Sequence, residues 1–482
     1  MIYERFLCHV AEHPDRTALR TSGGEVLTYR ELADRAERVA AGLDRASVRA
    51  GDTVATWLDN TPGYVAAVLA LCRIGAVHLP VGRQADADRI RTLLDRSGAS
   101  LLVVGDGLPD VRRIPRTVRL DDLEVPAAAG GPAGRSPHSG VFRLQETSGS
   151  TGVPRLVAWR QEDLLADRLA WIEWTGLTPD DRVCCMHPLD VAHGSDVHLF
   201  PALLSGGELL LVESGATPDT VLGFLADHGA TVFSALPRHY EQLVTASEAR
   251  GGVRLPSLRL PLCGGAYLNG ATVERAEETL GIRVRRIYGS TEFGIVLGNP
   301  DDVPQAGRGM RPLPGVEVRL EPLGASRPDQ GELIARSAAT SVGYHGDDEA
   351  TARAFRDGWY RTGDVAERRP DGEYRVLGRT GDAIPAGDRA LFAPVLEEEL
   401  AARLPLDEVV VLAGGRSGLL VLAVPAPGAD AAEAGAGVLA ELAALGAGAT
   451  VHVVDAIPHT PVGKADRPRI RRLFPDDPGP RA

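Results

Sequence analysis

Two glycines and four hydroxyl residues stand together in the segment TSGSTG, residues 147–152, two residues after the mainly apolar run VFRL. Glycine lets backbone N–H groups approach an anion closely, and serine and threonine hydroxyls add neutral hydrogen-bond donors. Such a loop can hold phosphate oxygens. It lacks the G-K-[ST] ending of a Walker A loop, and similar clusters also form plain turns. A phosphate site is therefore one interpretation, and an ordinary turn is the other.

Two further segments carry side chains suited to a nucleotide. In RRIYGSTEFG, Tyr288 is an aromatic residue that can stack on a base, and Glu292 is a carboxylate that can bind Mg²⁺. In GWYRTGDVAERRPDGEYRVLGR, Asp364 can accept hydrogen bonds from sugar hydroxyls and Arg379 can contact an anion. Each segment by itself is more typical of a surface hairpin.

Lys464, in the segment IPHTPVGKADR, is the only lysine among 482 residues. The other strongly basic side chains are arginines, which present a planar fork, whereas lysine presents a compact ammonium with three rotatable donors. A site that bridges two oxygens outside one plane needs the second kind of cation. The alternative is a stray surface lysine in a lysine-poor chain.

The segments that must position these side chains include both predicted helices and predicted strands. The segment TYRELADRAERVAAGL begins at the N-cap residue Thr28 and repeats apolar residues at helical spacing. The runs LLVVG, LLLVES, TVFSAL and VRRIYG, which begin at residues 101, 209, 231 and 284, have the composition of strands. Strands that alternate with helices in this way predict an α/β fold. The proline- and glycine-rich residues 124–140 predict an irregular connection.

Composition restricts the class of partner. The formal net charge is -13 and no lysine-rich run is present, which argues against a nucleic-acid surface. Five cysteines without C-x-x-C spacing fit neither a disulfide framework nor a zinc knuckle. The N-terminal segment lacks the apolar core of a signal peptide, and no apolar run reaches about 18 residues. We expect a cytoplasmic protein with a small-molecule or protein partner, and neither nucleic-acid nor membrane binding.

Taken in order along the chain, these motifs resemble those of the adenylate-forming superfamily, which includes acyl-CoA synthetases, adenylation enzymes of peptide synthesis and firefly-type luciferases. The similarity covers nearly the whole chain and rests on TSGSTGVPR, LCGGAY, YGSTEFG, YRTGD, GRTGD and TPVGKADR. It implies a large N-terminal domain of several subdomains, residues 1–379, and a small α+β C-terminal domain, residues 381–482, joined by a hinge. The active site is expected in the cleft between them.

The resemblance also implies a role for each matching residue. ATP and AMP contacts are implied for Thr147, Ser148, Gly149, Ser150, Thr151, Gly152, Gly264, Gly265, Ala266, Tyr288, Gly289, Ser290, Asp364 and Arg379. Catalytic roles are implied for Thr291, for Glu292 as the Mg²⁺ ligand, and for Lys464. Lys464 would bridge the substrate carboxylate and the ribose–phosphate oxygens during attack on the α-phosphate of ATP. The acyl group would then pass to the thiol of CoA or of a carrier protein's phosphopantetheine arm.

The resemblance also predicts an acid pocket formed by His193 and Asp196, in the segment HPLDVAHGSDVHLFPALLSGG, together with Gly264 and Ile295. His193 stands where amino-acid-activating relatives carry the aspartate that pairs with the substrate amine, which indicates an acid other than an α-amino acid. Asp190 and Asp196 are neighbouring carboxylates that could still accept an amine. A metal site formed by these aspartates and His187, His193 and His198 is a weaker alternative, because the spacing matches no usual zinc pattern.

The resemblance is incomplete at the hinge. Gly381 stands two residues after Arg379, where family members usually carry a charged residue, and Pro385 stands where lysine is common. Glycine permits rotation but provides no side chain to latch the domain. These departures concern the contacts made during thiol transfer.

Several functions remain open at this stage. The leading one is a free-standing AMP-forming acid–thiol ligase that uses ATP, Mg²⁺ and a thiol acceptor. An amino-acid adenylation enzyme, a luciferase-like oxygenase and a non-catalytic binding or regulatory descendant are the alternatives. The joint presence of Lys464, Glu292, Asp364 and Arg379 argues against the last of these.

Overall fold

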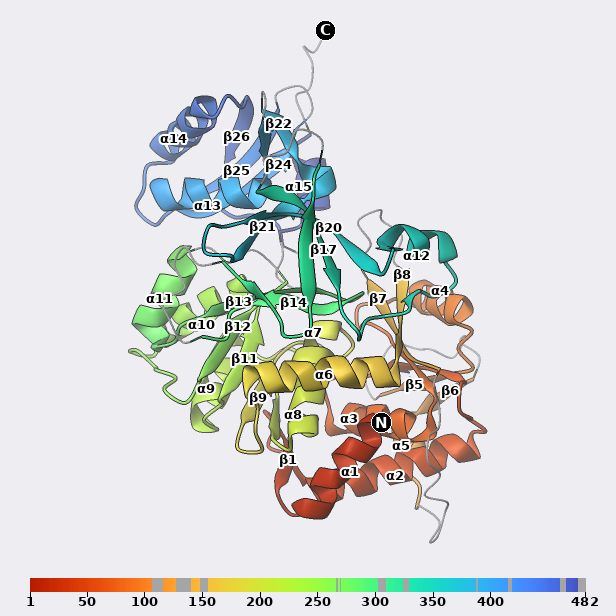
Figure 1. Cartoon of the computed structure of the whole chain (residues 1–482). Coiled ribbons are helices and arrows are strands. Elements are labelled where there is room, and N and C mark those ends of the chain that lie inside the picture. The colour runs from red at the N-terminus through yellow and green to blue at the C-terminus, as the bar shows by residue number, and fades with distance from the viewer. Residues whose placement is uncertain are drawn as a thin grey trace.

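The computed structural model of the protein describes residues 1–105, 116–126, 140–147, 155–265, 268, 270–301, 309–323, 329–386, 389–414, 418–459 and 465–475. Within these residues, a large N-terminal body carries a smaller C-terminal part above it (Figure 1). The expected α/β architecture with a large and a small domain is confirmed. The boundary at residues 379–381 stays a prediction.

The first sheet of the large body is mainly parallel. In spatial order it contains β15 (Arg311–Pro312), β14 (Gly294–Gly298), β13 (Arg285–Ser290), β12 (Leu260–Cys263), β11 (Val232–Ala235), β9 (Arg182–Cys185), β10 (Glu208–Leu211), β1 (Thr17–Thr21) and β2 (Val26–Thr28). Parallel neighbours need crossover connections. Those between β10 and β13 contain α9 (Pro218–Asp227), α10 (Pro237–Ala249) and α11 (Gly270–Leu280).

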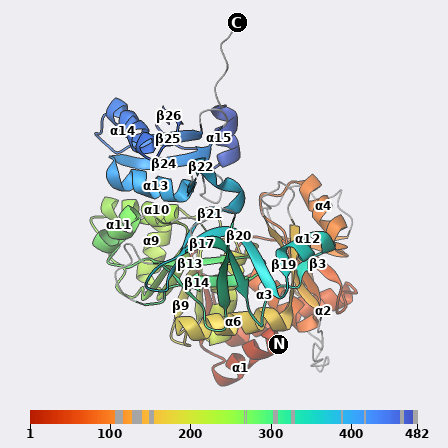
Figure 2. The same cartoon turned by 45° about the horizontal axis from the view of Figure 1, so that its top comes forward.

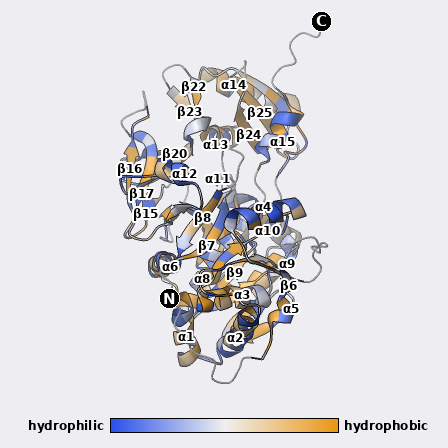
Figure 3. Ribbon diagram, turned by 90° about the vertical axis from the view of Figure 1, so that its right-hand side faces the viewer, coloured by the Kyte–Doolittle hydropathy of each residue, from blue (hydrophilic) through white to orange (hydrophobic). Residues whose placement is uncertain are grey.

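The second sheet of the large body also mixes parallel and antiparallel pairs. It contains β18 (Gly343–Tyr344), β8 (Arg155–Arg160), β7 (Val141–Thr147), β4 (Val77–Pro80), β3 (Thr53–Trp57), β5 (Leu101–Val104) and β6 (Thr117–Arg119). The short elements α4 (Ala87–Ser97), α5 (Leu120–Leu123) and α12 (Asp348–Ala354) lie beside it. In Figure 3, hydrophilic residues dominate α4.

One hydrophobic core joins the two sheets. It takes side chains from both of them and from α1 (Ile2–Glu12), α2 (Tyr29–Arg45), α3 (Pro62–Ile74), α6 (Gln161–Thr175) and α8 (Phe200–Ser205). The predicted helix after Thr28 is α2. The Thr28 hydroxyl accepts a hydrogen bond from the Glu31 N–H at 3.2 Å, and Glu31 accepts one from the Thr28 N–H at 2.8 Å, which together form a capping box.

An antiparallel sheet connects this body to the C-terminal part. It is formed by β16 (Glu317–Glu321), β17 (Gln330–Arg336), β20 (Trp359–Arg368), β19 (Phe355–Arg356) and β21 (Tyr374–Arg379). The chain then passes through η2 (Thr380–Asp382) into the hairpin β22 (Ile384–Ala386) and β23 (Arg389–Leu391). A Cβ atom at Gly381 would meet no atom of the described residues within 4 Å, so packing in this conformation does not require glycine there.

The C-terminal part has its own core. Its elements are α13 (Ala393–Arg403), β24 (Leu406–Ala413), β25 (Leu419–Pro425), α14 (Ala431–Ala444), β26 (Ala449–Val453) and α15 (Arg467–Leu473). Leu396, Val411, Val421 and Val438 are buried together between α13, α14 and the sheet. Figure 2 shows this part seated over the body, with α13 next to α11. Across the boundary, Arg375 on β21 pairs with Glu398 on α13 at 2.5 Å.

The predicted strands at residues 101, 209, 231 and 284 are observed as β5, β10, β11 and β13. Most of the predicted connection at residues 124–140 lies outside the described residues. Among the helices that the structure describes, none combines the length and apolar character needed to cross a bilayer.

Candidate active site

A cavity of about 1180 Å³ lies between the large body and the C-terminal part. Segments distant in sequence line it, from β7, β13, β20 and β21 to Phe392, Pro394 and Arg467 of the C-terminal part. The predicted residues that line it are Thr147, His193, Asp196, Gly264, Gly265, Tyr288, Gly289, Ser290, Thr291, Glu292, Ile295, Asp364 and Arg379. The other predicted residues, Ser148, Gly149, Ser150, Thr151, Gly152, Ala266 and Lys464, lie outside the described residues.

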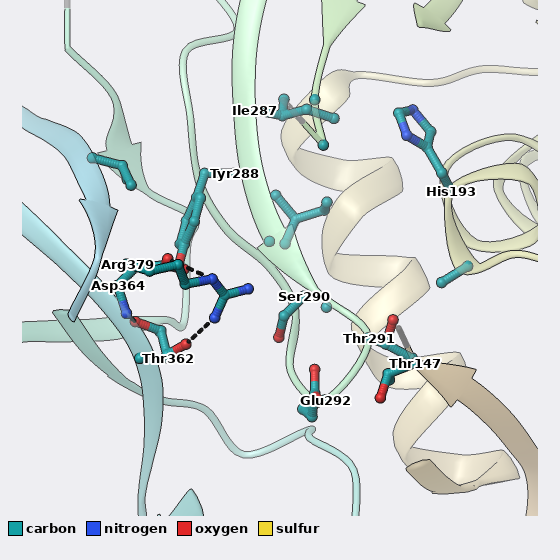
Figure 4. A pocket seen from close by; sticks show the side chains of 18 of the residues that line it. Thr147, His193, Ile287, Tyr288, Ser290, Thr291, Glu292, Thr362, Asp364 and Arg379 are labelled. Atoms are coloured by element: carbon teal, nitrogen blue, oxygen red, sulfur yellow. Dashed lines mark hydrogen bonds and ion pairs between the residues drawn. The ribbon is translucent and has the colours of Figure 1, made fainter. Parts of the chain in front are cut away.

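The YGSTEFG motif forms one wall of the cavity. Strand β13 ends at Ser290 and the chain turns back into β14, so that Thr291 and Glu292 occupy the turn (Figure 4). The Trp159 indole N–H donates to the Thr291 carbonyl at 2.8 Å. The Tyr344 hydroxyl donates to Glu292 Oε1 at 3.0 Å. These bonds fix the turn at the edge of the cavity.

Glu292 has the chemistry of a magnesium ligand. Its carboxylate lines the cavity, and among the described residues its side chain receives a hydrogen bond from the neutral Tyr344 hydroxyl. Carboxylate oxygens are hard donors of the kind that Mg²⁺ prefers. The residues present therefore fit a magnesium ion at this position.

A second wall is formed by Tyr288, Asp364 and Arg379, which come from three strands (Figure 4). The Tyr288 hydroxyl donates to Asp364 Oδ2, and Arg379 Nε lies 3.1 Å from Asp364 Oδ1. Arg379 also donates to the Thr362 carbonyl at 3.1 Å. Burial, reinforced by the Asp364 charge, raises the pKa of Tyr288 well above its ordinary value, so the hydroxyl keeps its proton. The three side chains form one fixed polar unit.

Histidine side chains lie at the end of the cavity away from Tyr288 and Asp364. His193 belongs to α7 (Ala192–Gly194) and points into the cavity (Figure 4). Its Nε2 atom lies 2.7 Å from Ser234 Oγ, and its ring stacks on His187 with centroids 4.1 Å apart. His198, in the segment η1 (Ser195–Leu199), bonds the His193 carbonyl at 2.8 Å. Burial lowers the pKa of His198 to about 4, so this ring is neutral at pH 7.

These histidines and the nearby aspartates do not converge on a metal. Among the described residues, no group of three or more histidine, cysteine, aspartate or glutamate side chains is placed to hold a metal ion. The rings of His187, His193 and His198 stack on one another or bond to the protein. The alternative of a zinc-like site is therefore unsupported in this part of the chain.

Asp196 lines the cavity, but its carboxylate is already paired. Both of its oxygens accept hydrogen bonds from Arg143 on β7, the second at 2.6 Å, and the Ser195 hydroxyl donates to Oδ1 at 2.9 Å. Arg143 is 1% exposed and Asp196 is 8% exposed. Burial alone would raise the pKa of Asp196, but the Arg143 charge and hydrogen bonds hold it below its ordinary value. Asp196 is thus half of an internal ion pair.

Asp190 has a different environment. It is buried, and an added Cβ atom on Gly82 would lie 3.3 Å from its Oδ2 atom. Burial raises the pKa of Asp190 to about 6. Asp190 is not among the residues that line the cavity, and Asp196 is already bonded by Arg143, so neither carboxylate is open to a substrate amine in this conformation.

Sequence reasoning missed several residues of this site. Arg143, Ser234, Thr362 and Tyr344 all bond to predicted residues, yet none of the four is itself among the predicted site residues, although Thr362 lies within the YRTGD motif. For Arg143 the sequence does carry one signal, which is an arginine within the otherwise apolar run VFRL. A buried charge requires a partner of opposite charge, so this arginine indicates an internal ion pair.

Comparisons with known proteins identify the family of the chain. Residues 6–345 match the family model described as AMP-binding enzyme. The chain is 32% identical to feruloyl-CoA synthase of an Amycolatopsis species, over 96% of each chain. It is 30% identical to phenyloxazoline synthase MbtB of Mycobacterium tuberculosis, over 98% of this chain and 34% of that protein.

Solved structures share the fold. Amide bond synthetase McbA from Marinactinospora thermotolerans gives a TM-score of 0.86 at 26% identity, over 98% of this chain and 100% of that chain. ATP-bound MatB from Rhodopseudomonas palustris gives a TM-score of 0.86 at 24% identity, over 98% and 99%. The resemblance inferred from the motifs is confirmed, and the chain belongs to the family of AMP-binding enzymes.

Proposed function

We propose that this protein activates a carboxylic acid with ATP and transfers the acyl group to a thiol. The observation that carries the proposal is one cavity of about 1180 Å³ lined by Thr147, His193, Tyr288, Glu292 and Asp364. These residues come from segments separated by up to 217 positions, the difference between 364 and 147. They combine groups for a nucleotide, for Mg²⁺ and for an acid.

In the first step, a carboxylate oxygen attacks the α-phosphorus of ATP, and the bond from that phosphorus to the β-phosphate oxygen breaks. Pyrophosphate leaves and acyl-AMP remains. Both reactants are anions, so catalysis consists of neutralising their repulsion and aligning the attack. Magnesium bound at Glu292 would supply positive charge at the phosphates. The Tyr288–Asp364–Arg379 unit would orient the nucleoside, and Lys464 would supply the mobile cation.

In the second step, a thiolate sulfur attacks the acyl carbonyl and AMP leaves. CoA is the first acceptor to test, because the chain is 32% identical to a feruloyl-CoA synthase. A carrier protein's phosphopantetheine arm is the second. The thiol proton is released to water in either case.

An ATP–pyrophosphate exchange assay over a panel of carboxylic acids tests the first step. Exchange with one or more acids supports an adenylating enzyme, and exchange with none would indicate a non-catalytic descendant. Thioester formation with CoA or a carrier protein then separates a ligase from a luciferase-like oxygenase, which would consume O₂ instead. The best acids in the panel also give the first information on substrate identity.

We expect α-amino acids to be poorer substrates than their matched des-amino acids, by roughly 10²-fold or more. His193, rather than an aspartate, stands at the position expected to bind the amine. Both oxygens of Asp196 already accept hydrogen bonds from Arg143. Phenylalanine and 3-phenylpropanoate form one matched pair for pyrophosphate exchange, because only the amine differs. If an α-amino acid were the best substrate of the panel, this expectation would be wrong and Asp190 would be the residue to test next.

Glu292→Gln should keep the fold but reduce adenylation by roughly 10²-fold at limiting Mg²⁺. The neutral amide still accepts the Tyr344 hydrogen bond but is a weaker magnesium ligand. The measurement is the exchange rate as a function of Mg²⁺ concentration, with excess Mg²⁺ partly restoring it. Glu278→Gln, at an exposed position on α11, is the matched control. An unchanged Mg²⁺ dependence would rule out Glu292 as the ligand.

A further inference from the structure

One turn of π-helix, η1, lies beside the end of the cavity that carries His193. In this turn the Phe200 N–H donates to the Ser195 carbonyl, five residues earlier instead of the four of an α-helix. The turn continues α7, which contains His193, and leads directly into α8. Such turns are rare and occur frequently at functional sites. A change in the register of η1 would move His193 relative to the cavity.

The π-turn leaves one main-chain acceptor without a main-chain donor. The next bond of the series would join the Asp196 carbonyl to the N–H of residue 201, but that residue is Pro201, which has no N–H. Arg168 on α6 supplies the missing donor, because its Nη1 atom donates to the Asp196 carbonyl. Arg168 is only 1% exposed. A buried carbonyl requires a partner, and a side chain from another helix provides it here.

The charged side chains around this bond balance one another. Burial lowers the pKa of Arg168 to about 10, so the guanidinium stays charged at pH 7. It pairs with Asp167, its neighbour in sequence, and Arg143 pairs with the Asp196 carboxylate. Two arginines thus face two aspartates, and the cluster carries no net charge with which to attract an anion. Its contacts are suited to holding main-chain geometry.

We propose that Arg168 is a positioning residue for acid recognition, which holds the π-turn at Asp196 and thereby fixes His193 in the pocket that receives the acid. Two further contacts depend on the same geometry. His193 Nε2 lies 2.7 Å from Ser234 Oγ, and His198, within the turn, bonds the His193 carbonyl at 2.8 Å. A shift of the turn would disturb both. This inference rests on the proposed acid-activating function.

Arg168→Met removes the donor and keeps a long side chain. In pyrophosphate exchange with the acid that the wild type uses best, we expect the KM for the acid to rise by roughly 10- to 100-fold, because a displaced His193 no longer meets the acid. The KM for ATP should stay within about two-fold, because Tyr288 and Asp364 lie at the other end of the cavity (Figure 4). Arg160→Met, at the exposed boundary of α6, is the matched control and should change neither constant.

Rescue experiments separate this role from a general loss of packing. Pro201→Ala restores a main-chain N–H five residues after Asp196, so the double variant Arg168→Met/Pro201→Ala should recover most of the affinity for the acid. Arg168→Lys keeps the charge and a donor and should recover part of it.

A second double variant separates the hydrogen bond from the charge. Asp167→Asn/Arg168→Met removes one charge of each sign, so the cluster stays neutral, and it should show the same rise in the KM for the acid. Thermal unfolding verifies the fold of each variant. If Arg168→Met does not fold, the neutral double variant takes its place in the comparison.

Three results would overturn the inference. The first is an unchanged KM for the acid in a folded variant that lacks Arg168, and the second is a parallel rise in the KM for ATP. The third is a rise in the KM for the acid that Pro201→Ala does not reduce, which would indicate direct contact between Arg168 and the acid. All three leave the acid-activating function standing, because the wild type still exchanges. Absence of exchange by the wild type with every acid would remove that function and this inference with it.

Discussion

Lys464→Arg is expected to lose acid adenylation by roughly 10²- to 10³-fold, although the positive charge is kept. A planar guanidinium cannot reproduce a compact ammonium that bridges oxygens outside one plane. Lys464 itself lies outside the described residues, but the chain on both sides is fixed: His459 and Ala465 form an antiparallel bridge, and His459 bonds Glu408 at 2.8 Å. Arg467, three residues further on, lines the cavity. The described chain that follows Lys464 therefore reaches the cavity at Arg467.

The two half-reactions isolate the role of Lys464. When pre-made acyl-adenylate is supplied, Lys464→Arg and Lys464→Ala should both form thioester at close to the wild-type rate, because we assign the lysine to adenylation alone. Arg472→Ala, at an exposed position of α15, is the control and should be normal in both steps. Normal adenylation by Lys464→Arg would show that the single lysine is a remnant of a lysine-poor composition. Equal loss of both steps would make its role structural.

Arg143→Met is expected to lower the free energy of unfolding by about 3–5 kcal/mol. The substitution removes the cation that hydrogen-bonds both Asp196 oxygens and leaves the buried carboxylate with only the Ser195 hydrogen bond and the charge of Arg168. Urea unfolding at pH 7 measures the loss. Arg49→Met is the matched control, because Arg49 and Asp44 form a pair at 2.7 Å that is 62% and 73% exposed. Exposed pairs contribute about 0–1 kcal/mol.

The pH dependence gives the same prediction a second measurement. The folded-state pKa of Asp196 is below its ordinary value, so its stabilising contribution is complete above that ordinary value and is lost as the pH falls through the lower folded value. The difference in stability between the wild type and Arg143→Met should therefore shrink in acid. A difference no larger than that of Arg49→Met, or one independent of acid pH, would mean that Arg143 and Asp196 are not coupled in solution.

The sequence by itself determined those features that depend on neighbouring residues. Helix α2 follows from Thr28, Glu31 and an apolar stripe within one segment, because capping bonds and i to i+4 spacing are local. The strands at residues 101, 209, 231 and 284 follow from short apolar runs. Family membership also follows from sequence, because the motifs are contiguous and occur in a fixed order.

Only the tertiary structure decided which charges and polar atoms meet. Asp196 is predicted from sequence as a pocket carboxylate, yet its partner Arg143 is 53 residues away in sequence, on strand β7. Tyr288 and Asp364, 76 residues apart, share a hydrogen bond that neither motif specifies. His187 is surrounded by the rings of His193, His198 and His239 only because the fold brings them together. A motif specifies the type of side chain at each position, whereas protonation, pairing and access depend on desolvation and on partners from elsewhere in the fold.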